Sequence, residues 1–168
     1  MGKEERNCAM IEVYHGGVGK IVYPLAKVGR ENLDFGKGFY LTRRLQRAKE
    51  WAERTARQRL GTPVVNVYEL DMEGVMREYR FRKFERYDSE WLQFIVLCRK
   101  GYDSSREYDC LEGGVANDRV IDTVEGFVNG TIDEEHAIME LSKHAPNNQL
   151  CILNQEVIDR YLTFKTVM

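Results

Sequence analysis

The chain has 168 residues, of which 43% are hydrophobic and 31% charged, and it contains only three prolines. This size and composition are typical of one globular domain with its own core, so we expect a single domain over residues 1–168. With a formal net charge of −2, the chain has no bulk positive charge that would favour binding to nucleic acid or to a membrane surface.

The start of the chain lacks the apolar core of a signal peptide, and no hydrophobic run approaches the length of a membrane span. Four cysteines, Cys8, Cys98, Cys110 and Cys151, lie far apart in or beside apolar runs, which is typical of buried, inert thiols. The sequence contains neither the paired cysteines nor the His-x-x-x-His pattern that would indicate a zinc site. We therefore expect a cytoplasmic protein with reduced thiols, no metal and no membrane partner.

The first half of the chain predicts strands around one long helix. Residues 9–14 read as a buried strand that leads into a glycine-rich turn, and residues 39–42 as a second strand. Apolar side chains at helical spacing predict a helix over residues 45–60, with Thr42 as a candidate N-cap and the Gly61-Thr62-Pro63 run as its stop. Residues 64–70 form the clearest strand.

The second half of the chain also predicts both helices and strands, in irregular order. It predicts helices at 89–99, 134–143 and 154–160, the last capped by Asn154, and strands at 149–153 and 162–167. A strand with a glycine bulge is expected over residues 108–116. Strands interrupted by irregularly placed helices favour an α+β fold over a doubly wound α/β sheet.

Basic residues are concentrated between Arg43 and Arg59, where seven lysines and arginines face two glutamates. This is typical of the solvated face of an ordinary helix. It is also a charge asymmetry that can steer an anionic ligand. Both interpretations stay open at the level of sequence.

Several nucleotide-binding signatures are excluded by their spacing. A phosphate-binding loop needs a glycine at position 14, which is Tyr14, and Ser or Thr after Lys20, which is followed by Ile21. No G-x-G-x-x-G fingerprint occurs. The Asp34-Phe35-Gly36 triplet has no catalytic loop before it, so it is no kinase signature.

Two other glycine motifs remain after this elimination. One is the tripeptide Tyr14-His15-Gly16, and the other is the segment from Gly36 to Thr42 with Tyr40 at its centre. A glycine turn lets backbone amides approach a ligand, and an aromatic side chain on a neighbouring strand can cover a flat ring. Each motif alone is typical of an ordinary turn or hairpin. Their order and spacing together predict a nucleotide site.

These motifs resemble those of the ADP-ribosyltransferase superfamily, in the branch of the diphtheria-type toxins and poly(ADP-ribose) polymerases with a His, Tyr, Glu triad. The likeness includes the helix with Ala48, Trp51 and Ala52 and runs over most of the chain. It is strongest to a bacterial family catalogued only as a domain of unknown function, with HG, D-F-G-x-G-F-Y-L-T and A-x-x-W-A motifs. The resemblance implies ADP-ribosyltransferase-like split antiparallel β-sheets packed with peripheral helices.

The third triad position departs from that branch. Its glutamate opens a late strand that a short helix and a final strand follow, and the segment from Asn148 to Leu153 fits this place. Gln149 then occupies the position of the glutamate. A rival alignment uses Gln93, but that residue comes too early and lies in a run with helical spacing.

The resemblance implies a role for each residue in holding NAD, the substrate. The backbone of Gly16 would clasp the nicotinamide carboxamide, His15 would bind a ribose hydroxyl, and Tyr40 would stack on the nicotinamide. Gln149 would bind the ribose 2′-hydroxyl. His15, Tyr40 and Gln149 are thus the expected catalytic set; further residues expected to bind NAD are Gly38, Thr42, Arg43 and Asp118.

The same resemblance implies an NAD-dependent mono-ADP-ribosyltransferase, in the manner of a toxin restrained by an antitoxin protein, acting on an unidentified macromolecular or small-molecule acceptor. A neutral amide at Gln149 neither stabilises a developing cation nor takes a proton. Three outcomes stay open: an acceptor that needs no base, another carboxylate such as Asp109 or Asp118, or an inactive module that binds NAD or ADP-ribose on the same fold.

Overall fold

The computed structural model describes residues 10–29, 33–116 and 120–168. Within these ranges the chain forms two β-sheets and six α-helices. In chain order the elements are β1 (Met10–Gly17), β2 (Phe39–Leu41), α1 (Leu45–Arg59), β3 (Val64–Asp71), α2 (Met72–Glu78), β4 (Phe81–Lys83), α3 (Ser89–Arg99), β5 (Cys110–Gly113), α4 (Ile121–Val128), α5 (Glu134–Leu141), β6 (Gln149–Ile152), α6 (Gln155–Tyr161) and β7 (Leu162–Val167).

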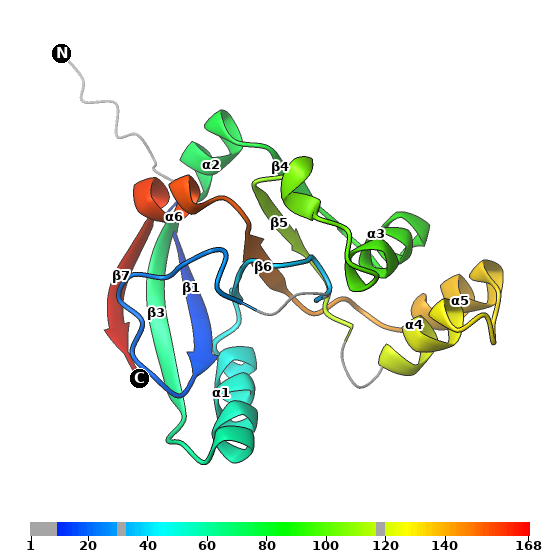
Figure 1. Ribbon diagram of the computed structural model, residues 1–168, viewed down its shortest axis with the longest axis horizontal. Helices are drawn as coiled ribbons and strands as arrows, with labels where there is room; N and C mark the ends of the chain where they lie inside the picture. The colour runs from blue at the N-terminus through cyan, green and yellow to red at the C-terminus, as the bar shows by residue number, and fades with distance from the viewer. Residues whose placement is uncertain (1–9, 30–32, 117–119) are drawn as a thin grey trace.

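The first sheet has the order β1-β3-β7 and is antiparallel throughout (Figure 1). Its central strand, β3, pairs with β1 from Met10↔Asp71 to Gly17↔Val64. Such strands place alternate side chains on opposite faces. On one face Val13, Tyr68 and Leu70 are fully buried in a cluster that continues into the second sheet.

The second sheet has the order β2-β6-β5-β4, with only β4 and β5 running parallel. It meets the first sheet at one antiparallel bridge, where the Tyr14 N–H donates to the Thr42 carbonyl over 2.8 Å and the Thr42 N–H donates back over 2.9 Å. Because this bridge joins β1 to the end of β2, it sets the Tyr14-His15-Gly16 motif beside the segment that carries Tyr40.

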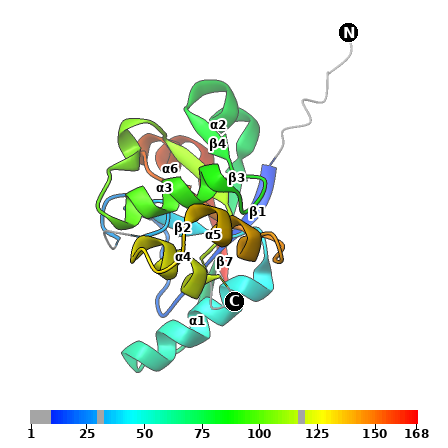
Figure 2. The ribbon, with the colours of Figure 1, turned by 90° about the vertical axis from the view of Figure 1, so that its right-hand side faces the viewer.

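The helices cover different parts of the two sheets. Helix α1 lies against the first sheet, where its buried Ala48 and Ala52 pack on Val65 and Val67 (Figure 1). Helices α3, α4 and α5 group on the side of the second sheet that is away from the first sheet (Figure 1), and they face the viewer in Figure 2. A second core lies between them and that sheet, centred on the fully buried Trp91. No helix in the described ranges is both long and apolar enough to cross a bilayer.

The predicted helices and strands are mostly confirmed, with differences at their ends. Arg44, not Thr42, is the N-cap of α1, and no side chain caps it; Thr42 Oγ1 accepts the Arg44 N–H over 3.1 Å. The helix stops because Leu60 adopts φ 52°, in the left-handed region, one residue before the expected glycine stop. The strand expected over 108–116 is shortened to β5.

Of the α-helices and strands, α2, β4 and α4 were not predicted. Helix α2 spans only seven residues, too few for a helical period to stand out, although Asp71 caps it by accepting the Gly74 N–H. With them, the chain is a mixed structure with two sheets that are largely antiparallel, consistent with the expected α+β class.

Candidate functional site

His15 lies on β1 with its ring stacked on Phe39, at 4.6 Å between centroids and 24° between planes. Its Nδ1 is 2.7 Å from the carbonyl oxygen of Tyr40. Because a carbonyl only accepts, Nδ1 carries the proton and Nε2 is left with a lone pair. Burial lowers the pKa of His15, and the Tyr40 carbonyl only partly opposes this, so the ring is neutral at pH 7. His15 therefore offers one acceptor, Nε2, to a ligand.

Gly16 presents its backbone at the edge of β1 beyond the bridge. In an antiparallel strand the N–H and C=O of alternate residues point to the same side. Those of Tyr14 point to Thr42, so those of Gly16 point the same way, away from β3. Within the described ranges, neither group joins a backbone hydrogen bond outside the strand ladders. Gly16 thus offers one donor and one acceptor side by side.

The absence of a side chain at Gly16 follows from packing. A Cβ there would lie 2.8 Å from the Ala52 nitrogen and closer still to the Ala48 carbonyl oxygen, both backbone atoms of α1. Glycine is what lets α1 lie directly against β1. The Tyr14-His15-Gly16 motif therefore has a structural function whatever it binds.

Tyr40 lies on β2, and its hydroxyl turns back to the segment before that strand. It donates to the Gly36 carbonyl over 2.5 Å and accepts the Phe35 N–H over 3.2 Å. Burial raises the pKa of Tyr40 well above its ordinary value, so the phenol stays protonated. These bonds fix the orientation of the aromatic ring and leave the hydroxyl no further proton to donate.

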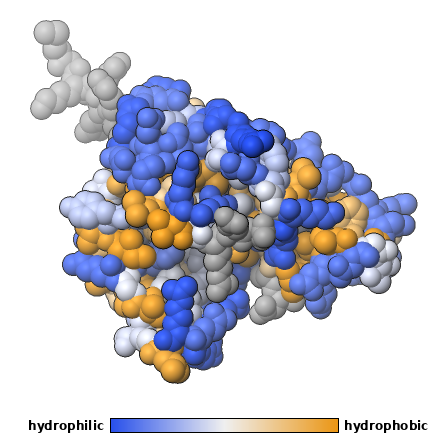
Figure 3. All heavy atoms as spheres, in the orientation of Figure 1, coloured by the Kyte–Doolittle hydropathy of each residue, from blue (hydrophilic) through white to orange (hydrophobic). Residues whose placement is uncertain are grey.

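His15, Gly38, Phe39 and Tyr40 line one cavity of about 480 Å³. Its outer wall comes from the segment between β1 and β2, where Tyr23 and Val28 are 88% and 73% exposed. Figure 3 shows hydrophobic atoms on this side of the molecule, in front of the first sheet. The cavity is open enough, and apolar enough, to take a flat ring.

Gln149 opens β6 and is only 3% exposed. Its amide nitrogen donates to the Gly114 carbonyl over 3.1 Å and lies 3.5 Å from Asp34 Oδ2. The Asp34 carboxylate also accepts two hydrogen bonds from Arg99, at 2.7 and 2.9 Å, and one from the Ala116 N–H at 2.9 Å. The Gln149 side chain is therefore bonded inside the protein.

This network gives a physical reason for an amide at position 149. A glutamate there would set a second carboxylate beside Asp34, and two such acids cannot both ionise cheaply. The structure brings His15 and Tyr40 to one cavity. It connects Tyr40 to Gln149 through the pairing of β2 with β6, where Tyr40 lies opposite Cys151, and through the segment from Asp34 to Gly36. Gln149 does not line that cavity.

The other expected NAD-binding residues lie as follows. Gly38 lines the cavity, and a Cβ there would lie 2.9 Å from the Ile152 carbonyl oxygen. Thr42 is fully buried at the bridge. Arg43 donates two hydrogen bonds, at 2.8 and 2.9 Å, to the buried Glu112. Asp118 lies outside the described residues.

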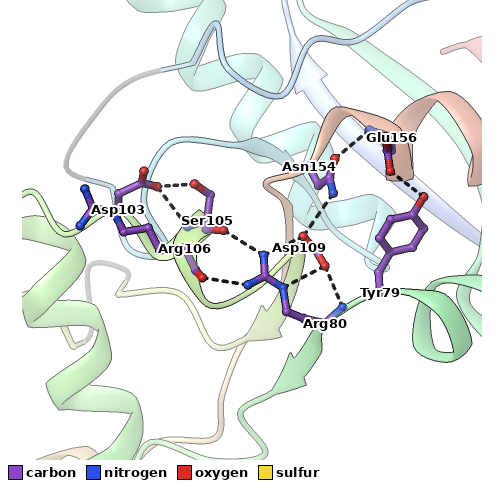
Figure 4. Close-up of polar contacts among 8 residues, drawn as sticks. All are labelled: Tyr79, Arg80, Asp103, Ser105, Arg106, Asp109, Asn154 and Glu156. Atoms are coloured by element: carbon purple, nitrogen blue, oxygen red, sulfur yellow. Dashed lines mark hydrogen bonds and ion pairs between the residues drawn. The ribbon is translucent and has the colours of Figure 1, made fainter.

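Asp109, the other carboxylate considered for catalysis, belongs to a structural network at the far end of β5 (Figure 4). It accepts hydrogen bonds from the backbone N–H and guanidinium of Arg80 and from the Asn154 amide, at 2.8–3.2 Å. Burial alone would raise its pKa, but the hydrogen bonds from Arg80 and Asn154 outweigh burial and lower it. Asp109 ties β4 and β5 to the start of α6.

Sequence reasoning missed two buried acids near the candidate site, Asp34 and Glu112. The sequence predicts for Asp34 only a place in the D-F-G-x-G-F-Y-L-T motif, and for Glu112 only a place in a strand with a glycine bulge. The one signal in the sequence was an acid flanked by residues otherwise expected to be buried, such as Phe35 and Leu111. Such an acid needs a charged partner, but the partners, Arg99 and Arg43, are 65 and 69 residues away.

Comparisons with known proteins place the chain in a family without assigning it an activity. Neither the curated proteins nor the solved structures gave a significant match. A family profile described as a protein of unknown function (DUF3990) matches residues 11–164. That match covers most of the chain, so the chain belongs to this family of proteins of unknown function, DUF3990.

Proposed function

We propose that this protein is an NAD-dependent mono-ADP-ribosyltransferase, built on an ADP-ribosyltransferase-like fold. The observation that supports it best is the outward-pointing N–H and C=O of Gly16 beside the neutral ring of His15. One donor and one acceptor on adjacent backbone atoms match the oxygen and NH₂ of a carboxamide. Nicotinamide carries that group.

The neighbouring side chains complete a binding mode for NAD. His15 Nε2 accepts a hydrogen bond from a ribose hydroxyl, because its other nitrogen already donates to Tyr40. The Tyr40 ring is held at the wall of the same cavity, where it covers the nicotinamide. In the reaction the bond between ribose C1′ and the nicotinamide nitrogen breaks, and the electron pair leaves with nicotinamide. The acceptor then bonds to C1′ and loses its proton.

Gln149 limits how strongly the protein drives that reaction. By the resemblance, a carboxylate at this position would stabilise the developing positive charge on the ribose, but here the position holds an amide whose hydrogen bonds are made within the protein. Losing one such electrostatic contribution typically reduces the rate by about a hundredfold or more. We therefore propose an acceptor that is already a good nucleophile, and no elongation of poly(ADP-ribose) chains.

Release of nicotinamide from labelled NAD, with transfer of label to bacterial lysate, tests this function. We expect both activities in the unaltered protein and a loss of at least about tenfold in His15→Ala, which removes one hydrogen bond to the ribose. The matched control is His136→Ala, because His136 is an exposed histidine on α5. No nicotinamide release by the unaltered protein, or an equal effect of both variants, would contradict the proposal.

A second function, binding of NAD or ADP-ribose without chemistry, is favoured by one specific observation. The Gln149 amide already donates to Gly114 and lies near Asp34, so it is not free to orient a ribose. Under this function NAD raises the melting temperature of the protein, the rise is reduced in His15→Ala, and no nicotinamide appears. Nicotinamide release above the uncatalysed rate would exclude it.

We further propose, from the resemblance, a cytoplasmic toxin that a cognate antitoxin protein restrains. Expression in bacteria is then expected to arrest growth, and the arrest is expected to weaken in His15→Ala. Unimpaired growth at full expression would count against this biological role and would leave the enzymatic proposal to be decided by the nicotinamide assay.

A further inference from the structure

Arg47, on α1, carries the one buried side-chain nitrogen or oxygen atom in the described part of the chain that forms no hydrogen bond, its Nε. The side chain is only 15% exposed, and its guanidinium lies over the Trp51 ring at 5.7 Å. Arg47 forms a long ion pair with Glu50 on the same helix, with 3.6 Å between Nη1 and the carboxylate oxygen, and the Glu50 side chain is half exposed. A buried N–H without a partner is unfavourable by about 1–3 kcal/mol.

Arg47 lines a cavity of about 250 Å³ between α1 and the segment that precedes β6. The groups around it are mainly polar: Glu50 on the same helix, the buried Tyr87, and His144 and Asn147 from the segment before β6. Tyr87 has its hydroxyl engaged, donating to the Val115 carbonyl over 2.8 Å and accepting the Asn147 N–H over 3.3 Å. These two hydrogen bonds fix the position of the Tyr87 side chain in the cavity wall.

The charged side chains that line this cavity are Arg47 and the half-exposed Glu50. Burial raises the pKa of Tyr87. The hydrogen bond from Asn147 and the charges of Arg47 and Arg44 oppose that rise, and the charge of Asp34 adds to it. This cavity is separate from the one that His15 and Tyr40 line. The two sites adjoin through α1, since Arg47 precedes the alanine that packs on Gly16.

We propose that this cavity is a binding site for a phosphate group, with Arg47 as its main contact. A guanidinium binds two oxygens of a phosphate side-on through Nε and one terminal nitrogen, and Nε of Arg47 has no other partner. His144 and Asn147 add hydrogen-bonding groups from the opposite wall. A tetrahedral phosphate uses donors from both walls at once, whereas a planar carboxylate uses the Arg47 side alone. The inference is independent of NAD cleavage.

Titration with inorganic phosphate, followed by ³¹P NMR in the absence of NAD, tests this site. We expect saturable binding to the unaltered protein and at least about tenfold weaker binding to Arg47→Ala, the loss of one charge-assisted hydrogen-bonded pair. Arg47→Lys keeps the charge without the planar fork, so its binding should fall between the two. The matched control, Arg57→Ala, removes an exposed arginine from the same helix and should bind as the unaltered protein does.

A second variant keeps the test decisive if Arg47→Ala does not fold. Glu50→Gln removes the only carboxylate among the described residues that line the cavity, at an exposed position, so phosphate binding should tighten severalfold. Adenosine monophosphate should bind and adenosine should not, which separates phosphate from base recognition. Displacement by acetate at equal ionic strength would overturn the assignment to phosphate. Equal affinities in Arg47→Lys, Glu50→Gln and Arg57→Ala would overturn the site itself.

Discussion

The two ends of the expected triad differ in how their polar groups are used. At the edge of β1, the Gly16 backbone and His15 Nε2 are available to a ligand. At the start of β6, the Gln149 amide lies against Gly114 and Asp34, and Asp34 is bonded in turn to Arg99. The first region has polar groups that the described hydrogen bonds do not use, and in the second region the polar groups are bonded within the fold.

The difference between these two regions shows that a residue can stand at the position of a motif while its side chain is used for hydrogen bonds within the protein. Gln149 is the residue expected, from the resemblance, at the place of a catalytic glutamate, and its amide donates to Gly114 and Asp34 there. The predictions below test each half, from the largest expected effect to the smallest.

Gly16→Ala should have the largest effect, because its Cβ would overlap backbone atoms of α1 that have no way to rotate aside. We expect a loss of more than about 3 kcal/mol in the free energy of unfolding, at the upper end for overpacking. Urea denaturation measures it. Gly19→Ala is the control, since no atom lies within 4 Å of a Cβ there; similar losses in both variants would contradict the packing argument.

Asp34→Ala should come next, because it leaves the Arg99 guanidinium without its carboxylate and Gln149 with one hydrogen bond fewer. Breaking a largely buried ion pair typically reduces stability by about 3 kcal/mol. The control is Glu140→Gln, which breaks the exposed pair with Lys143 and should change stability by less than about 0.5 kcal/mol. Equal effects in the two variants would show that the Asp34 network adds no stability.

Gln149→Glu should destabilise the protein by about 2 kcal/mol at pH 7, because one of two adjacent carboxyl groups must then take a raised pKa. A raised carboxyl pKa in the folded state reduces stability only where the unfolded state is ionised. The difference from the unaltered protein should therefore shrink as the pH falls toward 4. A constant difference across that range would show that Asp34 and position 149 do not share a proton. Any gain in nicotinamide release would show instead that position 149 does reach the substrate.

Tyr40→Phe should reduce stability by about 1 kcal/mol, because it removes the hydroxyl that bonds the Gly36 carbonyl and the Phe35 N–H. The ring itself stays, so binding of NAD, where it occurs, should change less than in Tyr40→Ala. Thermal unfolding with and without NAD measures both effects. Equal loss of NAD protection in both variants would mean that the hydroxyl and not the ring contacts the ligand.

His15 should contribute the smallest effect, a dependence of stability on pH. Its pKa in the folded protein lies below the ordinary value of 6.5, so the unfolded chain takes up the proton first. Stability should therefore fall as the pH drops below about 6.5 and level off beneath the folded pKa, and His15→Gln should lack this decline. Resonances of His15 in an NMR titration measure the folded pKa directly; a value above 6.5 would contradict the assignment.

Much of the fold could be predicted because its signals are local. The helical period of α1 and α3, and the cap at Asn154, come from residues within a few positions of one another. Short elements such as α2 and β4 carried too few residues for any period. They are held by contacts distant in sequence, as β4 is held by its parallel pairing with β5.

The candidate site was predictable only in part, for the same reason. The place of His15 beside the strand of Tyr40 followed from motif order, and the structure brings both to one cavity. The internal bonding of Gln149 did not follow, since its partner Asp34 lies 115 residues away and nothing local marks the pair. From the sequence, Arg47 cannot be told apart from the other basic residues of its helix, because the sequence does not show that its side chain is largely buried.

The hydrogen bonds of Asp34 also bear on the order in which contacts form while the chain is synthesised and folds. They join residues separated by 65, 82 and 115 positions, to Arg99, Ala116 and Gln149 respectively. Contacts of such long range form late, and a chain made from its N-terminus cannot form the last of them until β6 has left the ribosome. The hydrogen bond between Asp34 and Gln149 therefore forms only after Gln149 has been made, long after the segment with His15 and Gly16.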